Sequence, residues 1–100
     1  MAKGYWNISG TISNPEGMGP YLQAVEPYLA KFNARFFCRD LKTDVREGNA
    51  GALTVIIEFK SLAAAKTSYY APEYQEMLKH RQLHSNVSLS IVEEGDHTGH

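Results

Sequence analysis

The sequence predicts an α+β domain whose strands and helices follow the order β-α-β-β-α-β. Four segments are rich in aromatic and β-branched residues, as strands are: 3–12, 34–45, 52–59 and 86–94. Two intervening segments, about 14–32 and 62–84, carry helix-start signals and good helix formers. The chain has 100 residues, of which 43% are hydrophobic and 21% charged, a composition typical of one folded domain.

Alternation and proline mark the first strand and the first helix. In "KGYWNISGTI" (3–12), one side of the strand is apolar and the other is mostly polar. "SNPEG" follows, with Pro15 at the first helical position of a helix that runs to about Phe32. Pro20 and Pro27 predict an irregular first turn and a bend in this helix.

Turn and capping signals organise the second half of the chain. "REGNAG" (46–51) predicts the turn of a hairpin between the second and third strands. Ser61 then caps an alanine-rich helix, and Pro72 begins a second helical segment. After the last strand, we expect residues 95–100 to form a flexible tail, so that the domain comprises residues 1–94.

This element order is that of ferredoxin-like folds, in which a four-stranded antiparallel sheet carries the helices on one face. Alternation assigns to the face under the helices Ile8, Ile12, Phe36, Cys38, Val55, Ile57, Leu89 and Ile91. It assigns to the opposite face Tyr5, Asn7, Ser9, Arg35, Phe37, Arg39, Thr54, Ile56, Glu58, Ser88 and Ser90. Because this second set mixes aromatic and charged side chains, we expect a second copy of the chain to cover it in a homodimer.

Charge and cysteine content argue against several classes of partner. The formal net charge is -1, and lysine and arginine are spread along the chain, so we expect no nucleic acid and no membrane partner. No apolar run approaches the ~18 residues of a membrane span, and "MAKGYW" lacks the apolar core of a signal peptide. Cys38, the single cysteine, suits a reducing compartment, so the expected location is cytoplasmic.

Arg35, Arg39 and Glu58 form the first candidate site, because alternation places all three on the same face of the sheet. In one interpretation they are a structural network in which a carboxylate neutralises the arginines. In the other, Glu58 holds one guanidinium while the remaining donors bind a carboxylate or another anionic oxygen of a small ligand. The two interpretations are compatible, and a bulge in the second strand would move one of the two arginines to the other face.

Tyrosines and histidines near the helix break form the second candidate site. Tyr70 and Tyr74 lie four residues apart and are the expected pocket pair, although tyrosines here often serve only packing. His80 is a candidate for proton transfer, and Asn7 joins the ligand-binding set on the predicted mixed face. His80 and His84 have metal-binding spacing but no third ligand, so we expect no metal. We expect no cofactor either, since phosphate-loop and nucleophile-elbow motifs are missing.

Four stretches occur in an order that resembles the domain of unknown function 1330 family. They are "KGYW", "ARFFCRD", "VIIEF" before a serine-capped helix, and "YYAPEYQ" followed by an arginine. That family is similar to the dimeric α/β barrel superfamily, which also holds cofactor-independent monooxygenases, small isomerases, haem-handling enzymes and sensing domains. The resemblance implies a homodimer whose sheets pair into a barrel.

The sequence therefore predicts a cytoplasmic homodimer that binds a small anionic or aromatic molecule in a cavity between sheet and helices. One alternative is a cofactor-independent monooxygenase or isomerase, in which Arg39 stabilises an enolate while His80 or Tyr70 moves a proton. The other alternative is a purely structural dimer without a ligand.

Overall fold

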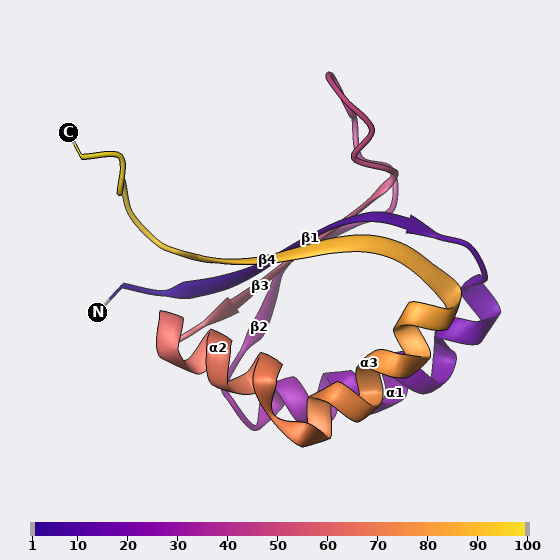
Figure 1. Ribbon diagram of the computed structural model, residues 1–100, viewed down its shortest axis with the longest axis horizontal. Helices are drawn as coiled ribbons and strands as arrows, with labels where there is room; N and C mark the ends of the chain where they lie inside the picture. The colour runs from indigo at the N-terminus through magenta and orange to yellow at the C-terminus, as the bar shows by residue number, and fades with distance from the viewer. Residues whose placement is uncertain (1, 100) are drawn as a thin grey trace.

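The computed structural model describes residues 2–99. Its elements are β1 (Gly4–Ile12), the 3-10 helix η1 (Pro15–Met18), α1 (Gly19–Ala30), β2 (Arg35–Asp40), β3 (Leu53–Phe59), α2 (Leu62–Tyr70), α3 (Pro72–His84) and β4 (Ser85–Glu93). The strands form one antiparallel sheet in the order β2-β3-β1-β4, with the α-helices on one side of it (Figure 1). The predicted ferredoxin-like class is thus confirmed. Met1 and His100, the ends of the predicted domain and tail, lie outside the described residues.

The core lies between the sheet and the helices, and Trp6 of β1 is at its centre. Trp6 is fully buried, and its indole N–H donates to the carbonyl oxygen of Ala65 in α2 (2.8 Å). Phe59 of β3 and Tyr74 of α3 pack against its ring, with centroid distances of 5.0 and 4.8 Å. We call this side of the sheet the helix-covered face and the other side the open face.

Proline positions explain where the first helix begins. Residues from Pro15 form only the short 3-10 helix η1, and α1 starts at Gly19 with Pro20 in its first turn. The predicted irregular first turn is confirmed, because Pro20 lacks the N–H that would continue a regular helix from η1. Pro27 lies inside α1, which continues to Ala30.

Pro72 divides the second helical region into α2 and α3, as predicted. The backbone of Ala71 between them is extended (φ −62°, ψ 137°), as expected for a residue before proline. Pro72 has no N–H, so the carbonyl of Ser68, four residues earlier, lacks its helical partner. The hydroxyl of Tyr28 in α1 donates to this carbonyl instead (2.8 Å), which joins α1 to the end of α2.

The second strand is shorter than the predicted 34–45, because β2 ends at Asp40. The Asp40 carboxylate accepts a hydrogen bond from the backbone N–H of Lys42 (2.7 Å), a side-chain turn that competes with strand pairing. Residues 41–52 form a longer connection that projects away from the helices in Figure 1. Gly51 in this connection has φ +89°, a left-handed conformation that favours glycine.

A β-bulge interrupts the pairing of β2 with β3. Phe36 pairs with Ile57, but Cys38 pairs with the adjacent Ile56, so Phe37 is an extra residue in β2. A bulge of this kind shifts the alternation of all later residues in the strand by one position.

The bulge corrects two of the predicted side-chain assignments. Cys38 lies on the open face, and Arg39, which pairs with Val55, lies on the helix-covered face. Arg35 precedes the bulge and pairs with Glu58 on the open face, as predicted. Arg35 and Arg39 are therefore on opposite faces of the sheet, so the expectation that they share one face was wrong.

Candidate functional site

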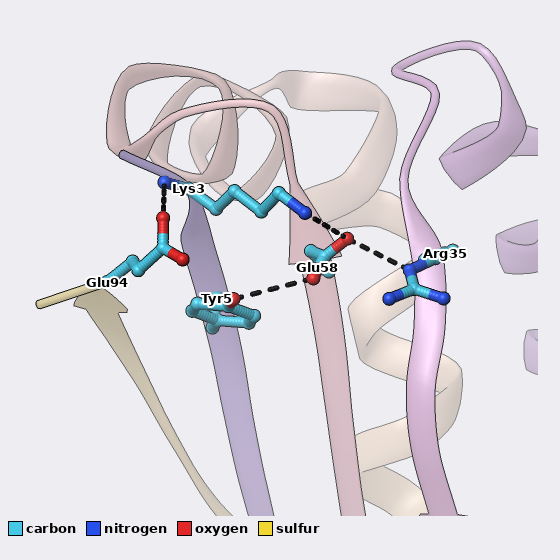
Figure 2. A network of polar contacts seen from close by, with 5 residues as sticks. All are labelled: Lys3, Tyr5, Arg35, Glu58 and Glu94. Atoms are coloured by element: carbon cyan, nitrogen blue, oxygen red, sulfur yellow. Dashed lines mark hydrogen bonds and ion pairs between the residues drawn. The ribbon is translucent and has the colours of Figure 1, made fainter. Parts of the chain in front are cut away.

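On the open face, Glu58 is the centre of a network of polar contacts (Figure 2). Its Oε1 accepts hydrogen bonds from Arg35 Nε (2.9 Å) and Lys3 Nζ (3.4 Å), and its Oε2 accepts one from the Tyr5 hydroxyl (3.4 Å). The backbone N–H of Lys3 donates to Glu94 Oε1 (3.0 Å). The hydrogen bond from Arg35 lowers the pKa of the Glu58 carboxyl and raises that of Arg35. This network joins β1, β2 and β3 through Tyr5, Arg35 and Glu58.

Two neighbours extend this surface. The Arg35 guanidinium lies 5.2 Å from the ring centroid of Phe37, which is itself 54% exposed. Asn7 is exposed on the same face, in register with Ile56 of β3. Neither Arg35, Glu58 nor Asn7 lines the cavity described below.

The predicted tyrosine pair is separated by the helix break. Tyr70, the last residue of α2, is 71% exposed and packs edge-on against Tyr69. Tyr74, in the first turn of α3, is fully buried, and its hydroxyl shares a hydrogen bond with that of Tyr21 (2.9 Å). A spacing of four residues places two side chains on the same face only in a continuous helix. Because the backbone of Ala71 is extended between α2 and α3, Tyr70 and Tyr74 do not share a helix face.

The two helical histidines also have different surroundings. His80 is exposed on α3. The His84 ring lies against Gly17 of η1, and its Nδ1 is 3.3 Å from Asn14 Nδ2. Within residues 2–99, no cluster of three or more His, Cys, Asp or Glu side chains could hold a metal ion.

A cavity of about 460 Å³ lies between the helix-covered face and α1. The sheet contributes Ile8, Ile12, Phe36, Leu53, Val55, Ile57 and Val87 to its lining, and the helical side contributes Pro15, Met18, Tyr21, Leu22 and Val25. The other lining residues are Arg39, Asp40, Leu41, Arg81 and Ser85. The cavity is thus largely apolar, with a few polar groups at its ends.

Arg81 of α3 is the buried polar group of this cavity. The residue is only 8% exposed, and its Nε atom is buried without a hydrogen-bond partner. No carboxylate of residues 2–99 forms an ion pair with it. Its guanidinium carbon lies 5.8 Å from the ring centroid of Tyr21. Arg81 therefore contributes a buried positive charge without a protein counter-ion.

The tyrosines beside Arg81 are neutral. Burial raises the pKa of both Tyr21 and Tyr74. The charge and hydrogen bonding of Arg81, and for Tyr74 the hydrogen bond with Tyr21, offset only part of this effect. Their hydroxyl groups thus remain protonated at neutral pH, as hydrogen-bond donors and acceptors rather than as anions. The positive charge of Arg81 is not neutralised by a phenolate.

Arg39 and Asp40 line the other end of the cavity, at the end of β2. Arg39 Nη1 is 3.7 Å from Glu26 Oε2 in α1, and its guanidinium carbon lies 3.9 Å from the ring centroid of Phe36. Leu41 is 67% exposed beside them. This end therefore opens to solvent, and Arg39 is the predicted site residue that does line the cavity.

Arg81 was absent from the predicted site, although the sequence contained a signal for it. Tyr74, Leu78 and Arg81 follow one another at helical spacing, and all three are buried on the same stripe of α3. A charged residue in such a stripe is rarely buried without a partner, which makes it a candidate for function.

An apolar cavity with one buried cation that forms no ion pair favours a particular kind of chemistry. A guanidinium presents several N–H donors in a planar arrangement that matches a carboxylate. The apolar walls favour hydrocarbon or aromatic surface. The residues present can therefore hold an apolar molecule that carries a negative charge at one end.

Comparison with known proteins shows the fold and the family. A search of functionally curated proteins gave no match.

No helix among residues 2–99 is long and apolar enough to cross a membrane.

Solved structures resemble this chain over nearly its whole length. A protein of unknown function from Rhodopseudomonas palustris has 16% identity, covers 95% of this chain and 84% of its own, and has a TM-score of 0.70. SnoaB, a cofactor-independent oxygenase from Streptomyces nogalater, has 13% identity, coverage of 99% and 98%, and a TM-score of 0.59. A dimeric protein of unknown function with a ferredoxin-like fold, from Bacteroides fragilis, has 15% identity, coverage of 94% and 96%, and a TM-score of 0.56.

At these identities the likeness concerns the fold alone. The family assignment comes from the sequence itself, because the model for the domain of unknown function DUF1330 matches residues 3–95. With nearly every residue of the chain inside this match, the protein belongs to the domain of unknown function 1330 family.

Proposed function

We propose that the chain binds a small apolar or aromatic carboxylate in the cavity between the sheet and α1. The observation that supports this most directly is the buried Arg81, which forms no ion pair and whose Nε atom has no hydrogen-bond partner, in an otherwise apolar wall. The cavity volume of about 460 Å³ lies within the range of roughly 300–1,000 Å³ found for small-molecule sites.

The electrostatics of the cavity support an anionic ligand. Burying a charge without a counter-ion costs several kcal/mol, so proteins seldom keep one without a reason. A ligand carboxylate would form charge-assisted hydrogen bonds with Arg81 and remove this cost. A neutral ligand of the same shape would gain the apolar contacts alone.

The proposal is tested with two ligands that differ only in charge. 2-Naphthoate has an aromatic body and a carboxylate, and 2-naphthamide has the same body with a neutral amide. We expect isothermal titration calorimetry to give at least roughly tenfold tighter binding for the naphthoate, since hydrogen bonds to charged groups contribute about 1.5–3 kcal/mol. In Arg81→Met this preference should disappear.

A matched variant controls for the loss of one positive charge. Arg46 is exposed in the connection of β2 to β3 and pairs with Asp44, so Arg46→Met changes the net charge equally at a distance from the cavity. We expect Arg46→Met to keep the preference for naphthoate. Equal binding of both probes by the wild type, or an unchanged preference in Arg81→Met, would contradict the proposal.

We also propose that the open face joins two copies of the chain. Three observations favour this second role: Phe37 is 54% exposed, Val92 is 45% exposed, and Tyr5 packs edge-on against Phe37 rather than into the core. Large apolar side chains on an open sheet face are typical of interaction surfaces. In such a dimer the Glu58 network would lie within or beside the interface.

Analytical ultracentrifugation tests the dimer at micromolar concentration. We expect a wild-type dimer and a monomeric Phe37→Asp variant, because the substitution places a charge in the apolar contact. Leu83→Asp is the matched control, since Leu83 is 74% exposed on α3, away from the open face. A wild-type monomer, or equal dissociation of both variants, would contradict this role.

Catalysis by this chain stays a prediction. The fold likeness to the oxygenase SnoaB supports cofactor-free oxygenation or isomerisation only in general terms. In such a reaction Arg81 or Arg39 would stabilise an enolate, while Tyr70 and His80 would need a ligand outside the cavity. The cytoplasmic location is likewise still a prediction.

A further inference from the structure

We infer that the ligand of this cavity carries two anionic groups at opposite ends, one for Arg81 and a second for Arg39. This inference depends on the proposed function and adds the length and the second charge of the ligand. It follows from where the two arginines enter the cavity.

Arg39 and Arg81 approach the cavity from opposite edges of the sheet. Arg39 belongs to β2, which is one edge strand. Arg81 lines the cavity together with Ser85 and Val87 of β4, which is the other edge strand. The two cations therefore lie at opposite ends of the cavity rather than together.

The strand register gives the scale of this separation. Arg39 pairs with Val55, Val55 pairs with Ile8, and Ile8 pairs with Leu89, so one row of residues crosses from β2 to β4. Neighbouring strands lie about 4.8 Å apart, which places the backbones of β2 and β4 about 14 Å from each other. Arg81 lies on α3 and lines the cavity beside Ser85 and Val87 of β4, so this span is the scale of the separation between the two arginines.

The space between the two arginines is apolar. Val55 and Ile8 lie in the row between them, and Ile57 adjoins these two residues on the sheet. Tyr21 and Val25 of α1 cover the same region from the other side. An apolar or aromatic body that lies across β3 and β1 would thus bring its two ends toward Arg39 and Arg81.

Arg39 has N–H groups that can donate hydrogen bonds to such a ligand. Its contact with Glu26 is long (3.7 Å), and both side chains are about half exposed (49% and 53%), so this ion pair contributes little. Its guanidinium stacks on Phe36, which leaves the N–H groups at its planar edge available. Asp40 also lines this end of the cavity, but it pairs with Thr54 on the open face, and its carboxylate accepts a hydrogen bond from the backbone N–H of Lys42.

Three carboxylates of one aromatic body test the inference. They are naphthalene-2-carboxylate, naphthalene-2,6-dicarboxylate with its groups at opposite ends, and naphthalene-2,3-dicarboxylate with both groups at one end. We expect calorimetry to show the 2,6-compound binding roughly tenfold more tightly than the monocarboxylate, while the 2,3-compound gains less than about threefold. The 2,3-compound controls for the general effect of a second charge.

A variant assigns the gain to one residue. In Arg39→Met the affinity ratio of the 2,6-compound to the monocarboxylate should fall to about one. Arg46→Met, which removes a more exposed positive charge away from the cavity, should keep the wild-type ratio. Circular dichroism of both variants checks that they fold.

The outcomes distinguish a failure of this inference alone from a failure of the proposed function. If naphthoate binding depends on Arg81 but the 2,6-compound shows no gain, the cavity site stands and the second anionic group is overturned. The same conclusion follows if the 2,3-compound gains equally, or if the gain survives in Arg39→Met. If the monocarboxylate does not bind, the proposed function and this inference fail together.

Discussion

Tyr28→Phe removes one hydroxyl group at the junction between α1 and α2. In the structure this hydroxyl donates to the carbonyl of Ser68 (2.8 Å), and Tyr28 is only 2% exposed. Pro72 cannot supply the helical N–H for this carbonyl, and the N–H of Ala71 donates to Thr67 instead. The substitution should therefore leave a buried carbonyl group without a hydrogen-bond partner.

The expected loss follows from that unpaired group. Leaving a buried acceptor unsatisfied costs about 1–3 kcal/mol of unfolding free energy. For a domain of this size, 1 kcal/mol shifts Tm by roughly 4–8 °C. Urea unfolding at one fixed protein concentration measures the difference, with fluorescence of Trp6, the single tryptophan, as the signal.

Tyr70→Phe is the matched control, because it makes the same chemical change at a tyrosine that is 71% exposed. We expect it to alter stability by less than about 0.5 kcal/mol. If Tyr28→Phe changes stability no more than Tyr70→Phe does, then the Ser68 carbonyl has another partner and our explanation of the α2–α3 break is wrong.

Three further predictions concern charge and backbone space. Arg81→Met should stabilise the protein without ligand by about 1 kcal/mol, seen as a higher Tm, because it removes a buried charge that forms no ion pair; a lower Tm would show that hydrogen bonds within the protein compensate for that charge. Arg35 holds the pKa of Glu58 below its usual 4.5, so this carboxylate stabilises the fold above that pH and loses the effect as the pH falls through the lowered pKa. The difference in urea stability between wild type and Glu58→Gln should accordingly shrink between about pH 5 and pH 3, and a difference that grows there would contradict the network. Gly4→Ala would place a Cβ atom 2.5 Å from the carbonyl oxygen of Ser61 and should cost about 1–3 kcal/mol, whereas Gly19→Ala meets nothing within 4 Å and should be neutral or slightly stabilising; equal effects in thermal unfolding would argue against this packing.

The elements of the fold could be predicted because their signals are local. Pro15, Ser61 and Pro72 each act on the backbone within one turn, and the structure has helices starting at or beside each of them. Strand alternation likewise placed Ile8 on the buried side of β1. Because the order of these elements leaves few ways to form one sheet, the ferredoxin-like class could be predicted from the sequence.

The candidate site could be predicted only in part, since its residues come together from distant elements. Arg39 was identified, but on the wrong face, because alternation assumes an uninterrupted ladder and the bulge at Phe37 exists only in the pairing of β2 with β3. Tyr70 and Tyr74 were expected to act together, but the extended backbone of Ala71 turns one outward and buries the other.

The sequence by itself determined which segments form helices and strands, because backbone propensity, proline and capping act between near neighbours. Only the tertiary structure decided that Arg81 lies in an apolar cavity without a carboxylate partner and that Arg39 faces it from the other edge of the sheet. Burial, register and the distance to a counter-ion depend on residues far apart in the chain, and one extra residue in a strand is enough to reverse the face on which a charge lies.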